Sequence, residues 1–303
     1  MSDTNNFTLQ STKDGSFTFF SPEFNEAFHS NYGAKQESYL KFAVPTQVQK
    51  VARKGIVKIL DVCYGLGYNT AAALEVIWQE NPTCIVEVIG LEINPEVPKA
   101  AMSQDIFNDW DDEYRTILNE LAFKHYCQTN RLQAKLLIGD ARKLIQEVGK
   151  SGFLADAIFL DPFSPPHCPQ LWTVEFIQKL TQCLHRDGLL ATYSCAAAVR
   201  TALLAAKLVI GSTAPVGRRT PGTIGAYPDG VNDTLISSVH RITGIYPLSV
   251  AEKEHLQTRA AIPYRDPSLS DTGELILSRR RQEQETSPLE TTSKWRKRWL
   301  GKG

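Results

Sequence analysis

The segment Asp61-Val62-Cys63-Tyr64-Gly65-Leu66-Gly67-Tyr68-Asn69-Thr70 is the most informative part of this chain. It follows a short apolar run at 58–60 and leads into an alanine-rich stretch at 71–78. This order predicts a strand, a tight glycine turn and the N-terminus of a helix in quick succession. Because glycine has no Cβ, such a turn lets a ligand approach the backbone closely.

The turn departs from the fingerprint of dinucleotide-binding proteins in two ways. Thr70 stands where that fingerprint has its third glycine, and the acid Asp61 comes directly before the loop. A carboxylate at this place suits a cationic ligand better than a pyrophosphate, and S-adenosylmethionine (SAM) carries both a sulfonium and an ammonium. A G-x-G turn can also be purely structural, so the assignment depends on the rest of the chain.

The composition is that of an ordinary globular protein. Of the 303 residues, 42% are hydrophobic, which suffices for the core of one large α/β domain or two small ones. The formal net charge is zero, so any contact with RNA must use a local basic patch rather than a global field. The six scattered cysteines form no C-x-x-C pair, which argues against a zinc site and a disulfide scaffold, and we expect no metal.

These features predict a cytoplasmic protein. Unpaired cysteines are typical of the reducing cytosol. Residues 1–6 are polar and lack the apolar core of a signal peptide. The longest apolar stretches are well short of a membrane span, so we expect no membrane partner.

Strand-like and helix-like segments alternate regularly through the middle of the chain. Strand followed by helix, repeated five times, predicts a parallel sheet covered by helices on both faces. Right-handed crossovers then leave the functional loops at the carboxyl ends of the strands. The expected strands are 57–62, 84–91, 134–139, 155–160 and 188–193, and the expected helices are 69–80, 95–103, 141–149, 170–185 and 196–209.

Other segments lie outside this alternation. Residues 7–20 predict a β-hairpin around the turn signal at 13–16, followed by a helix near 37–53. An inserted segment at 105–133, with a helix around 113–126, either covers the site or faces a substrate. Residues 278–303 hold eight Lys or Arg against three Glu, which predicts a disordered tail or a lone short helix.

Further acids fall where a nucleoside-binding sheet needs them. Glu92 ends the second expected strand, where a carboxylate can accept hydrogen bonds from ribose hydroxyls. Asp140 ends the third, where it can accept from the adenine amine, cap the following helix, or do both. With Asp61, Gly65 and Gly67, these acids have the order and spacing of a class I SAM-dependent methyltransferase, a Rossmann-like α/β fold with a mostly parallel, seven-stranded sheet.

We divide the chain accordingly into four parts. Residues 1–55 form an N-terminal hairpin and helix extension, and 56–230 form the methyltransferase domain. Residues 231–277 form an extension without an assigned role, and 278–303 form the basic tail.

The fourth expected strand runs into a proline-rich loop, Asp161-Pro162-Phe163-Ser164-Pro165-Pro166-His167-Cys168-Pro169. The prolines fix the backbone and lower the entropy cost of holding the loop. Methyl transfer to an amine needs a neutral lone pair on nitrogen, and Asp161 can hold the amine N–H and offset the charge that develops. We expect Asp161 to be the catalytic residue. His167 is a weaker candidate for the base, and Phe163 and Trp172 either stack on a substrate base or pack the loop.

With these motifs in view, the chain resembles the methyltransferase half of the bacterial tRNA wobble-uridine enzyme MnmC, in its stand-alone form without the FAD-dependent oxidase. The resemblance covers roughly residues 7–227. The matching segments are 12–16, 29–34 with Glu37, 65–69, 139–141, 161–165 with Pro169 and Trp172, and 191–194.

The resemblance implies roles for individual residues. Gly65, Gly67, Glu92 and Asp140 would bind SAM, and Asp161 would be the catalytic acid. We expect Tyr68, Asn69 and Ala141, which adjoin those residues, to contact SAM as well. Glu37 would lie with Phe163 and Trp172 on the substrate side.

The reaction implied by the resemblance is methylation of the 5-aminomethyl group of uridine or 2-thiouridine at tRNA wobble position 34, which gives 5-methylaminomethyl-uridine. No second glycine fingerprint follows residue 230, so we expect no flavin and no removal of a carboxymethyl group. A small-molecule amine methyl- or aminopropyl-transferase and a non-catalytic RNA-binding module are the alternatives.

Basic residues near the end of the matched region are candidates for contacts with tRNA phosphates. Arg218 and Arg219 lie in a turn expected near the site, and a second group lies in the tail. A run of charges at the end of a chain is also often just solvated. The tail candidates are Arg279, Arg280, Arg281, Lys294, Arg296, Lys297 and Arg298.

Overall fold

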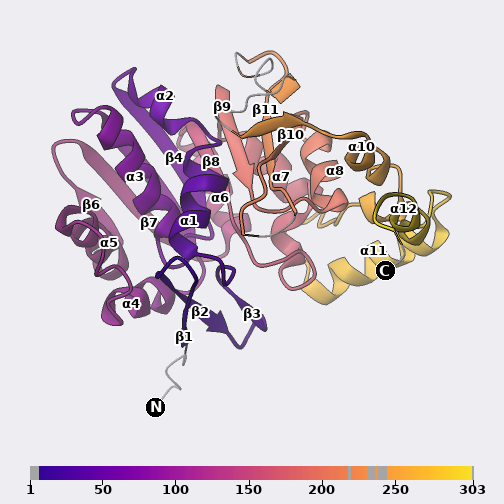
Figure 1. Ribbon diagram of the computed structural model, residues 1–303, viewed down its shortest axis with the longest axis horizontal. Helices are drawn as coiled ribbons and strands as arrows, with labels where there is room; N and C mark the ends of the chain where they lie inside the picture. Colours follow the sequence, from indigo (N-terminus) through magenta and orange to yellow (C-terminus); the bar gives the residue numbers. More distant parts are fainter. Residues whose placement is uncertain (1–6, 218–219, 231, 233–235, 238–243, 302–303) are drawn as a thin grey trace.

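The computed structural model describes residues 7–217, 220–230, 232, 236–237 and 244–301. In this part of the chain the central feature is a nine-stranded sheet with helices on both sides (Figure 1). Across the sheet the strands are β12 (Ile245–Pro247), β10 (Val209–Thr213), β11 (Thr223–Ala226), β9 (Leu184–Thr192), β8 (Ala155–Leu160), β4 (Ile56–Val62), β5 (Ile85–Glu92), β7 (Leu132–Ile138) and β6 (Tyr126–Gln128).

Strands β7, β5, β4, β8 and β9 are mutually parallel, and the remaining four pair antiparallel at the two sides. The predicted seven-stranded, mostly parallel sheet is therefore present, with the short strands β6 and β12 added at its edges. The carboxyl ends of β4, β5, β7 and β8 meet at one edge of the sheet, because parallel strands run in the same direction.

The sheet divides the core into two hydrophobic clusters. Along β4, Val57 and Ile59 face the first cluster, whereas Leu60 and Val62 face the second, as the two-residue period of a strand requires. Helices α3 (Tyr68–Glu80) and α5 (Asp112–Lys124) contribute to the first cluster. Helices α6 (Ala141–Lys150), α7 (Val174–Thr181) and α8 (Ala197–Ala205) contribute to the second.

Most expected elements lie within two residues of their observed bounds, including α4 (Glu96–Ser103). The expected helix at 170–185 is wrong in extent: a 3-10 turn, η2 (Pro169–Trp172), precedes α7, and β9 begins already at Leu184. The break comes at Thr173, whose backbone is extended rather than helical. Its hydroxyl caps α7 by accepting a hydrogen bond from the N–H of Phe176. The inserted segment packs on the first cluster, where Tyr114 stacks on Trp78 at 6.0 Å.

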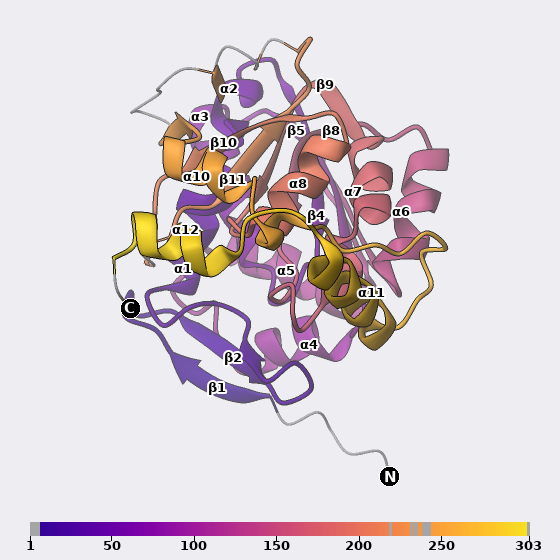
Figure 2. The same cartoon turned by 90° about the vertical axis from the view of Figure 1, so that its right-hand side faces the viewer.

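The predicted N-terminal hairpin is confirmed as β1 (Thr8–Ser11) and β2 (Phe17–Ser21), to which β3 (Glu26–Ala27) adds a third strand. This small sheet lies at one end of the molecule (Figure 2). The continuous helix expected near 37–53 is wrong. Pro45 lacks an N–H, and the segment is split into α1 (Ala34–Glu37), a π-helical turn η1 (Ser38–Ala43) and α2 (Val48–Ala52).

The expectation of a disordered tail or a lone helix at 278–303 is also wrong for its described residues. Helices α10 (Val250–His255), α11 (Gly273–Thr286) and α12 (Thr292–Trp299), with the turn η3 (Arg259–Ala261), pack along one side of the molecule (Figure 2). The Trp295 ring stacks on His255 at 4.0 Å, and Ile276 is fully buried in the second cluster.

Basic side chains hold this C-terminal part through hydrogen bonds. The Arg280 guanidinium donates to the carbonyl oxygens of Ile262 and Ala260 and lies over the Tyr264 ring. Such contacts produce no apolar periodicity in the sequence. For this reason the charge and composition of residues 278–303 wrongly predicted a disordered tail or a lone short helix. No helix in the described part of the chain has the length and apolar character needed to cross a membrane.

Candidate active site

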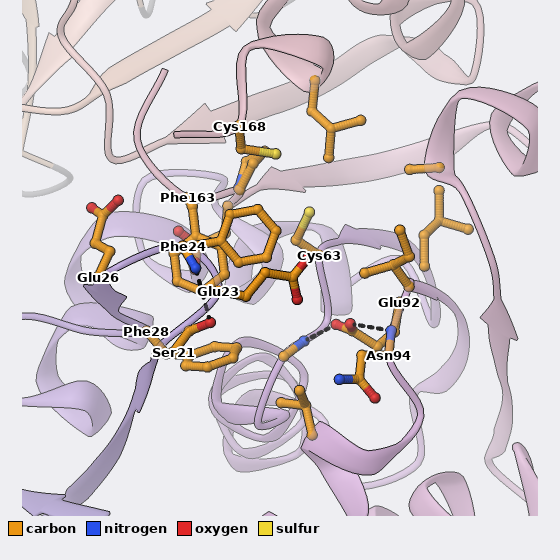
Figure 3. A pocket seen from close by; sticks show the side chains of 18 of the residues that line it. Ser21, Glu23, Phe24, Glu26, Phe28, Cys63, Glu92, Asn94, Phe163 and Cys168 are labelled. Carbon is orange, nitrogen blue, oxygen red and sulfur yellow. Dashed lines mark hydrogen bonds between the residues drawn. The ribbon is translucent and has the colours of Figure 1, made fainter. Parts of the chain in front are cut away.

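A cavity opens at the carboxyl ends of β4, β5, β7 and β8, and the small N-terminal sheet closes one side of it. The aromatic side chains of Phe24, Phe28 and Phe163 gather on one side of the cavity, and Glu92 lies across from them (Figure 3). Of the residues predicted to form the site, those that line the cavity are Glu37, Gly65, Glu92, Asp140, Ala141, Asp161 and Phe163.

The two glycines of the turn have different roles. Gly65 lines the cavity with a left-handed backbone, φ 57°, which a side chain would strain. Gly67, also left-handed, lies behind the cavity, where a Cβ would come within 2.8 Å of the Tyr64 hydroxyl. Gly67 is therefore needed for packing at the start of α3, and its predicted contact with SAM has no support from the cavity lining.

Glu92 is held by backbone N–H groups. One carboxylate oxygen accepts from Gly65 at 2.8 Å and the other from Asn94 at 2.9 Å (Figure 3). Burial raises the pKa of the Glu92 carboxyl, and the hydrogen bonds from Asn94 and Gly65 only partly oppose this. Each oxygen keeps a further lone pair, so Glu92 can accept from ribose hydroxyls in the cavity.

Asp61 does not line the cavity, contrary to the prediction that it meets the cationic ligand. Its side chain is fully buried and accepts a hydrogen bond from the Thr70 hydroxyl at 2.7 Å. The other carboxylate oxygen has no hydrogen-bond partner within the described residues. Burial raises the pKa of Asp61 to about 7, against the lowering effect of Thr70. In this structure Asp61 fixes the first turn of α3.

Asp140 caps helix α6, as the sequence predicted, by accepting from the Arg142 N–H at 2.9 Å. The Arg142 guanidinium also donates to both carboxylate oxygens and reaches Asp266 at 2.8 Å. Burial raises the pKa of Asp140, but the hydrogen bonds and charge of Arg142 outweigh burial and lower it. Asp140 and Ala141 line the cavity, and a contact of Asp140 with adenine remains a prediction.

Asp161 lies at the end of β8 and lines the same cavity as Gly65, Glu92 and Asp140. Its carboxylate accepts from the Asn69 amide at 2.9 Å. Burial, more than any other cause, raises the pKa of Asp161 well above its ordinary value. Asn69, predicted to contact SAM, is absent from the cavity lining and instead orients Asp161.

The proline-rich loop after Asp161 is fixed from two sides. The Glu26 carboxylate of β3 accepts from the Ser164 N–H at 3.0 Å and pairs with His167 at 3.1 Å. His167 does not line the cavity, so it is not placed to act as the base. Trp172 is fully buried and donates its indole N–H to the Phe163 carbonyl at 2.8 Å. The alternative that Trp172 packs the loop therefore holds, and its predicted substrate contact is wrong.

Phe163 remains available to a ligand. It lines the cavity, stacks on Phe24 with ring centroids 4.4 Å apart and meets the edge of Phe28 at 4.9 Å. Tyr68 is not available, although we predicted that it contacts SAM. Its ring is 1% exposed, and its hydroxyl donates to the backbone carbonyl of Phe17 at 3.0 Å.

Two charged residues near Asp161 complete the cavity. Glu37, predicted on the substrate side, lines it and accepts hydrogen bonds from Ser30 and from the Lys41 ammonium at 3.3 Å. Burial opposes ionisation of Glu37, but Lys41 and Ser30 outweigh it and lower its pKa. Sequence reasoning missed Lys41, because a Glu and a Lys four residues apart are typical of an exposed helix face.

The basic residues predicted to contact tRNA phosphates fall into three groups. Arg218 and Arg219 lie outside the described residues. In the tail, Arg279, Arg280 and Arg298 bond to other parts of the protein, so they are not free for phosphate. The described tail candidates with neither an ion pair nor a side-chain hydrogen bond to the described residues are Arg281, Lys294, Arg296 and Lys297.

The residues present fit SAM at one end of the cavity and an amine at the other. Gly65 allows close approach to the backbone, and the buried Glu92 offers acceptor oxygens for hydroxyls. At the other end, Asp161 and Glu37 place two carboxylates beside an aromatic wall. A cation with an attached ring is the ligand that this second end suits best.

Known proteins resemble the chain in sequence and structure. A family model described as S-adenosyl-L-methionine-dependent methyltransferase matches residues 104–228. The structure is similar to MnmC2 from Aquifex aeolicus, with a TM-score of 0.78 and 30% sequence identity, over 94% of this chain and 87% of that one.

Two further relatives are known from sequence. The protein MJ0670 of Methanocaldococcus jannaschii is 29% identical over 282 residues, which are 91% of this chain and 72% of that protein. A bifunctional MnmC protein from Methylibium petroleiphilum, named for tRNA 5-methylaminomethyl-2-thiouridine biosynthesis, is 26% identical over 220 residues. The match covers 68% of this chain, and the chain spans 32% of that longer protein.

Proposed function

The chain belongs to the MnmC-like family of SAM-dependent methyltransferases, and from that membership we propose that it methylates the 5-aminomethyl group of uridine or 2-thiouridine at tRNA wobble position 34. The names of its MnmC relatives support this substrate, since they refer to biosynthesis of tRNA 5-methylaminomethyl-2-thiouridine. The product would be 5-methylaminomethyl-uridine.

One observation carries the proposal: the Asp161 carboxylate shares a cavity with Gly65, Glu92 and Asp140, although the four residues follow or end four different strands. An amine entering from the side of the aromatic wall meets this carboxylate, which can bind it as an ammonium and, once the ammonium has lost a proton to water, accept a hydrogen bond from the remaining N–H of the neutral amine. The contact orients the nitrogen lone pair and offsets the positive charge that forms on nitrogen. Asn69 keeps the carboxylate in place through its amide.

At the other end, we assign the cofactor to Gly65, Glu92, Asp140 and Ala141. When bound, SAM supplies an electrophilic methyl group on a sulfonium. Glu92 would accept from the ribose hydroxyls, and the backbone at Gly65 and Ala141 would pack against the nucleoside. The aromatic residues and the small sheet would exclude water from the reacting nitrogen.

The test uses purified protein, SAM and tRNA that carries 5-aminomethyl-uridine at the wobble position. We expect a mass gain of one CH2 unit on that nucleoside after digestion, and none on the same tRNA with unmodified uridine. Parallel reactions with polyamines test the alternative amine substrates. Methylation of polyamines without methylation of the tRNA would contradict the proposal.

A further inference from the structure

Lys41 is a buried lysine whose bonding capacity is largely unused. It lines the cavity, is 2% exposed, and donates to Glu37 at 3.3 Å, its one recorded partner within the described residues. An ammonium has three N–H donors, and leaving donors unsatisfied in a buried place costs free energy. The spare donors of Lys41 therefore point to an acceptor that the bound ligand supplies.

The charges around Lys41 restrict what that acceptor can be. The substrate's own ammonium is excluded, because two cations would repel each other. A phosphate is disfavoured, because Glu37, Glu92 and Asp161 are among six carboxylates that line the same cavity. Since Lys41 and Glu37 already form a neutral pair, a neutral carbonyl oxygen fits without adding a charge to the cavity, and the carboxylate of SAM is the competing acceptor.

Resting on the proposed function, we propose that Lys41 donates a hydrogen bond to the C4 carbonyl oxygen of the substrate uracil and so selects uridine over cytidine. The C4 oxygen and the C5 aminomethyl group are neighbours on the ring. A base that offers its amine to Asp161 therefore brings the C4 oxygen toward the adjoining part of the cavity, where Lys41 and Glu37 lie. Phe163 would support the ring face.

Cytosine is the informative competitor. It carries an amino group at C4, which is a donor and would face the donors of Lys41. A site built to bond one group rejects an analogue that cannot make the bond, because its buried polar groups are left unpaired. We expect the wild-type protein to prefer 5-aminomethyl-uridine over 5-aminomethyl-cytidine by at least about tenfold in kcat/KM.

The experiment compares synthetic anticodon stem-loops that differ only in these two bases. In Lys41→Met, kcat/KM for the uridine RNA should fall by about tenfold to a hundredfold, and the preference for uridine should approach one. In the double variant Lys41→Met/Glu37→Gln, which removes both charges, kcat/KM falls further because Glu37 lies at the amine end, and the readout is the preference for uridine, which should stay close to one. Binding of SAM by calorimetry should be unchanged in Lys41→Met, since the charge of Lys41 acts on Asp161 at the amine end; a weakened SAM affinity would assign Lys41 to the cofactor carboxylate and overturn the inference.

A purely structural role for Lys41, as counter-ion of Glu37, gives a different result. The double variant would then keep the wild-type preference for uridine over cytidine, whatever its kcat/KM, and this would overturn the inference. Lys41→Gln serves if Lys41→Met does not fold, with the same expected loss of preference.

Wild-type protein alone also tests the inference. Equal methylation of both RNAs would overturn it and leave the proposed function intact. Methylation of neither RNA would instead overturn the proposed function, and the inference with it.

Discussion

The two ends of the cavity are built differently. At the cofactor end, Glu92 and Asp140 each accept from the backbone N–H two residues ahead, at Asn94 and Arg142, and Glu92 also accepts from Gly65, 27 residues away. At the amine end the partners are remote: Asn69 bonds to Asp161 across 92 residues, and Glu26 bonds to Ser164 across 138. The cofactor end thus depends mainly on local sequence, whereas Asp161 and its loop at the amine end depend on tertiary assembly.

The largest expected effect is on the chemistry at the amine end. Asp161→Asn keeps the shape of the side chain but removes the charge that binds and orients the amine. We expect kcat to fall by about 100-fold to 10,000-fold, with SAM affinity unchanged, in methyl-transfer and calorimetry measurements. Glu96→Gln is the control, because this acid is exposed on α4 and outside the cavity. Comparable turnover in Asp161→Asn would remove Asp161 from the mechanism.

Because the amine end depends on tertiary packing, removing a buried side chain that supports it should cost much stability. Trp172 is fully buried and supports the loop through the Phe163 carbonyl. Trp172→Ala should lower the free energy of unfolding by about 3–5 kcal/mol in urea titrations. Trp299, 40% exposed, is the matched control, and its replacement by Ala should cost less than about 1 kcal/mol. Similar losses for the two tryptophans would argue against this role for Trp172.

Asp61, which fixes the first turn of α3, makes the free energy of unfolding depend on pH. Its folded pKa of about 7 lies above the ordinary value of 3.8 because the side chain is buried. The neutral carboxyl is favoured on folding, so this stabilisation is complete below about pH 4 and is lost as the pH rises through about 7.

The free energy of unfolding should therefore be higher near pH 5 than near pH 8, and Asp61→Asn should reduce that difference by about 1–4 kcal/mol. Urea titrations at both pH values measure it. Asp112→Asn, at an exposed position, should leave the difference unchanged. An unchanged difference in Asp61→Asn would mean that Asp61 does not change its protonation in the folded protein between these two pH values.

A smaller effect is expected at the cofactor end itself. Glu92→Gln leaves one oxygen to accept from two backbone N–H groups and turns an amide toward the ligand hydroxyls. SAM affinity should weaken by about tenfold to a hundredfold in calorimetry, whereas Glu96→Gln should bind normally. Wild-type affinity in Glu92→Gln would move the ribose contact elsewhere.

The smallest effect is expected in the tail. Lys297 is exposed and has no recorded ion pair within the described residues. Lys297→Ala should change stability by less than about 0.5 kcal/mol. If Lys297 contacts a tRNA phosphate, the salt slope of tRNA binding should decrease by about one. An unchanged slope would exclude that contact.

The sequence allowed the parallel sheet and the acids at its edge to be predicted, because strand order places the ends of β4, β5, β7 and β8 together. Glu92 and Asp161 could be found in this way. Which way a side chain points could not: Tyr68 and Trp172 adjoin functional residues but turn into the core, where their polar atoms bond to backbone carbonyls.

The burial of Lys41 and the packing of the tail could not be predicted for a related reason. A solvated run of charges was one expectation for the tail, yet Arg280 is packed on Tyr264. Lys41, for which the sequence analysis made no prediction, is buried beside Glu37. Burial of a charge depends on partners supplied by tertiary structure, so composition alone does not reveal it. The signal that was present, a Glu and a Lys four residues apart, occurs equally on exposed helices.

Whether the two ends form one active site can be decided by a crystal structure of the protein with the demethylated cofactor, S-adenosylhomocysteine. We predict that the ribose hydroxyls bond to Glu92 and that the sulfur faces Asp161. A ligand bound with its sulfur directed away from Asp161, or bound in another cavity, would contradict the account.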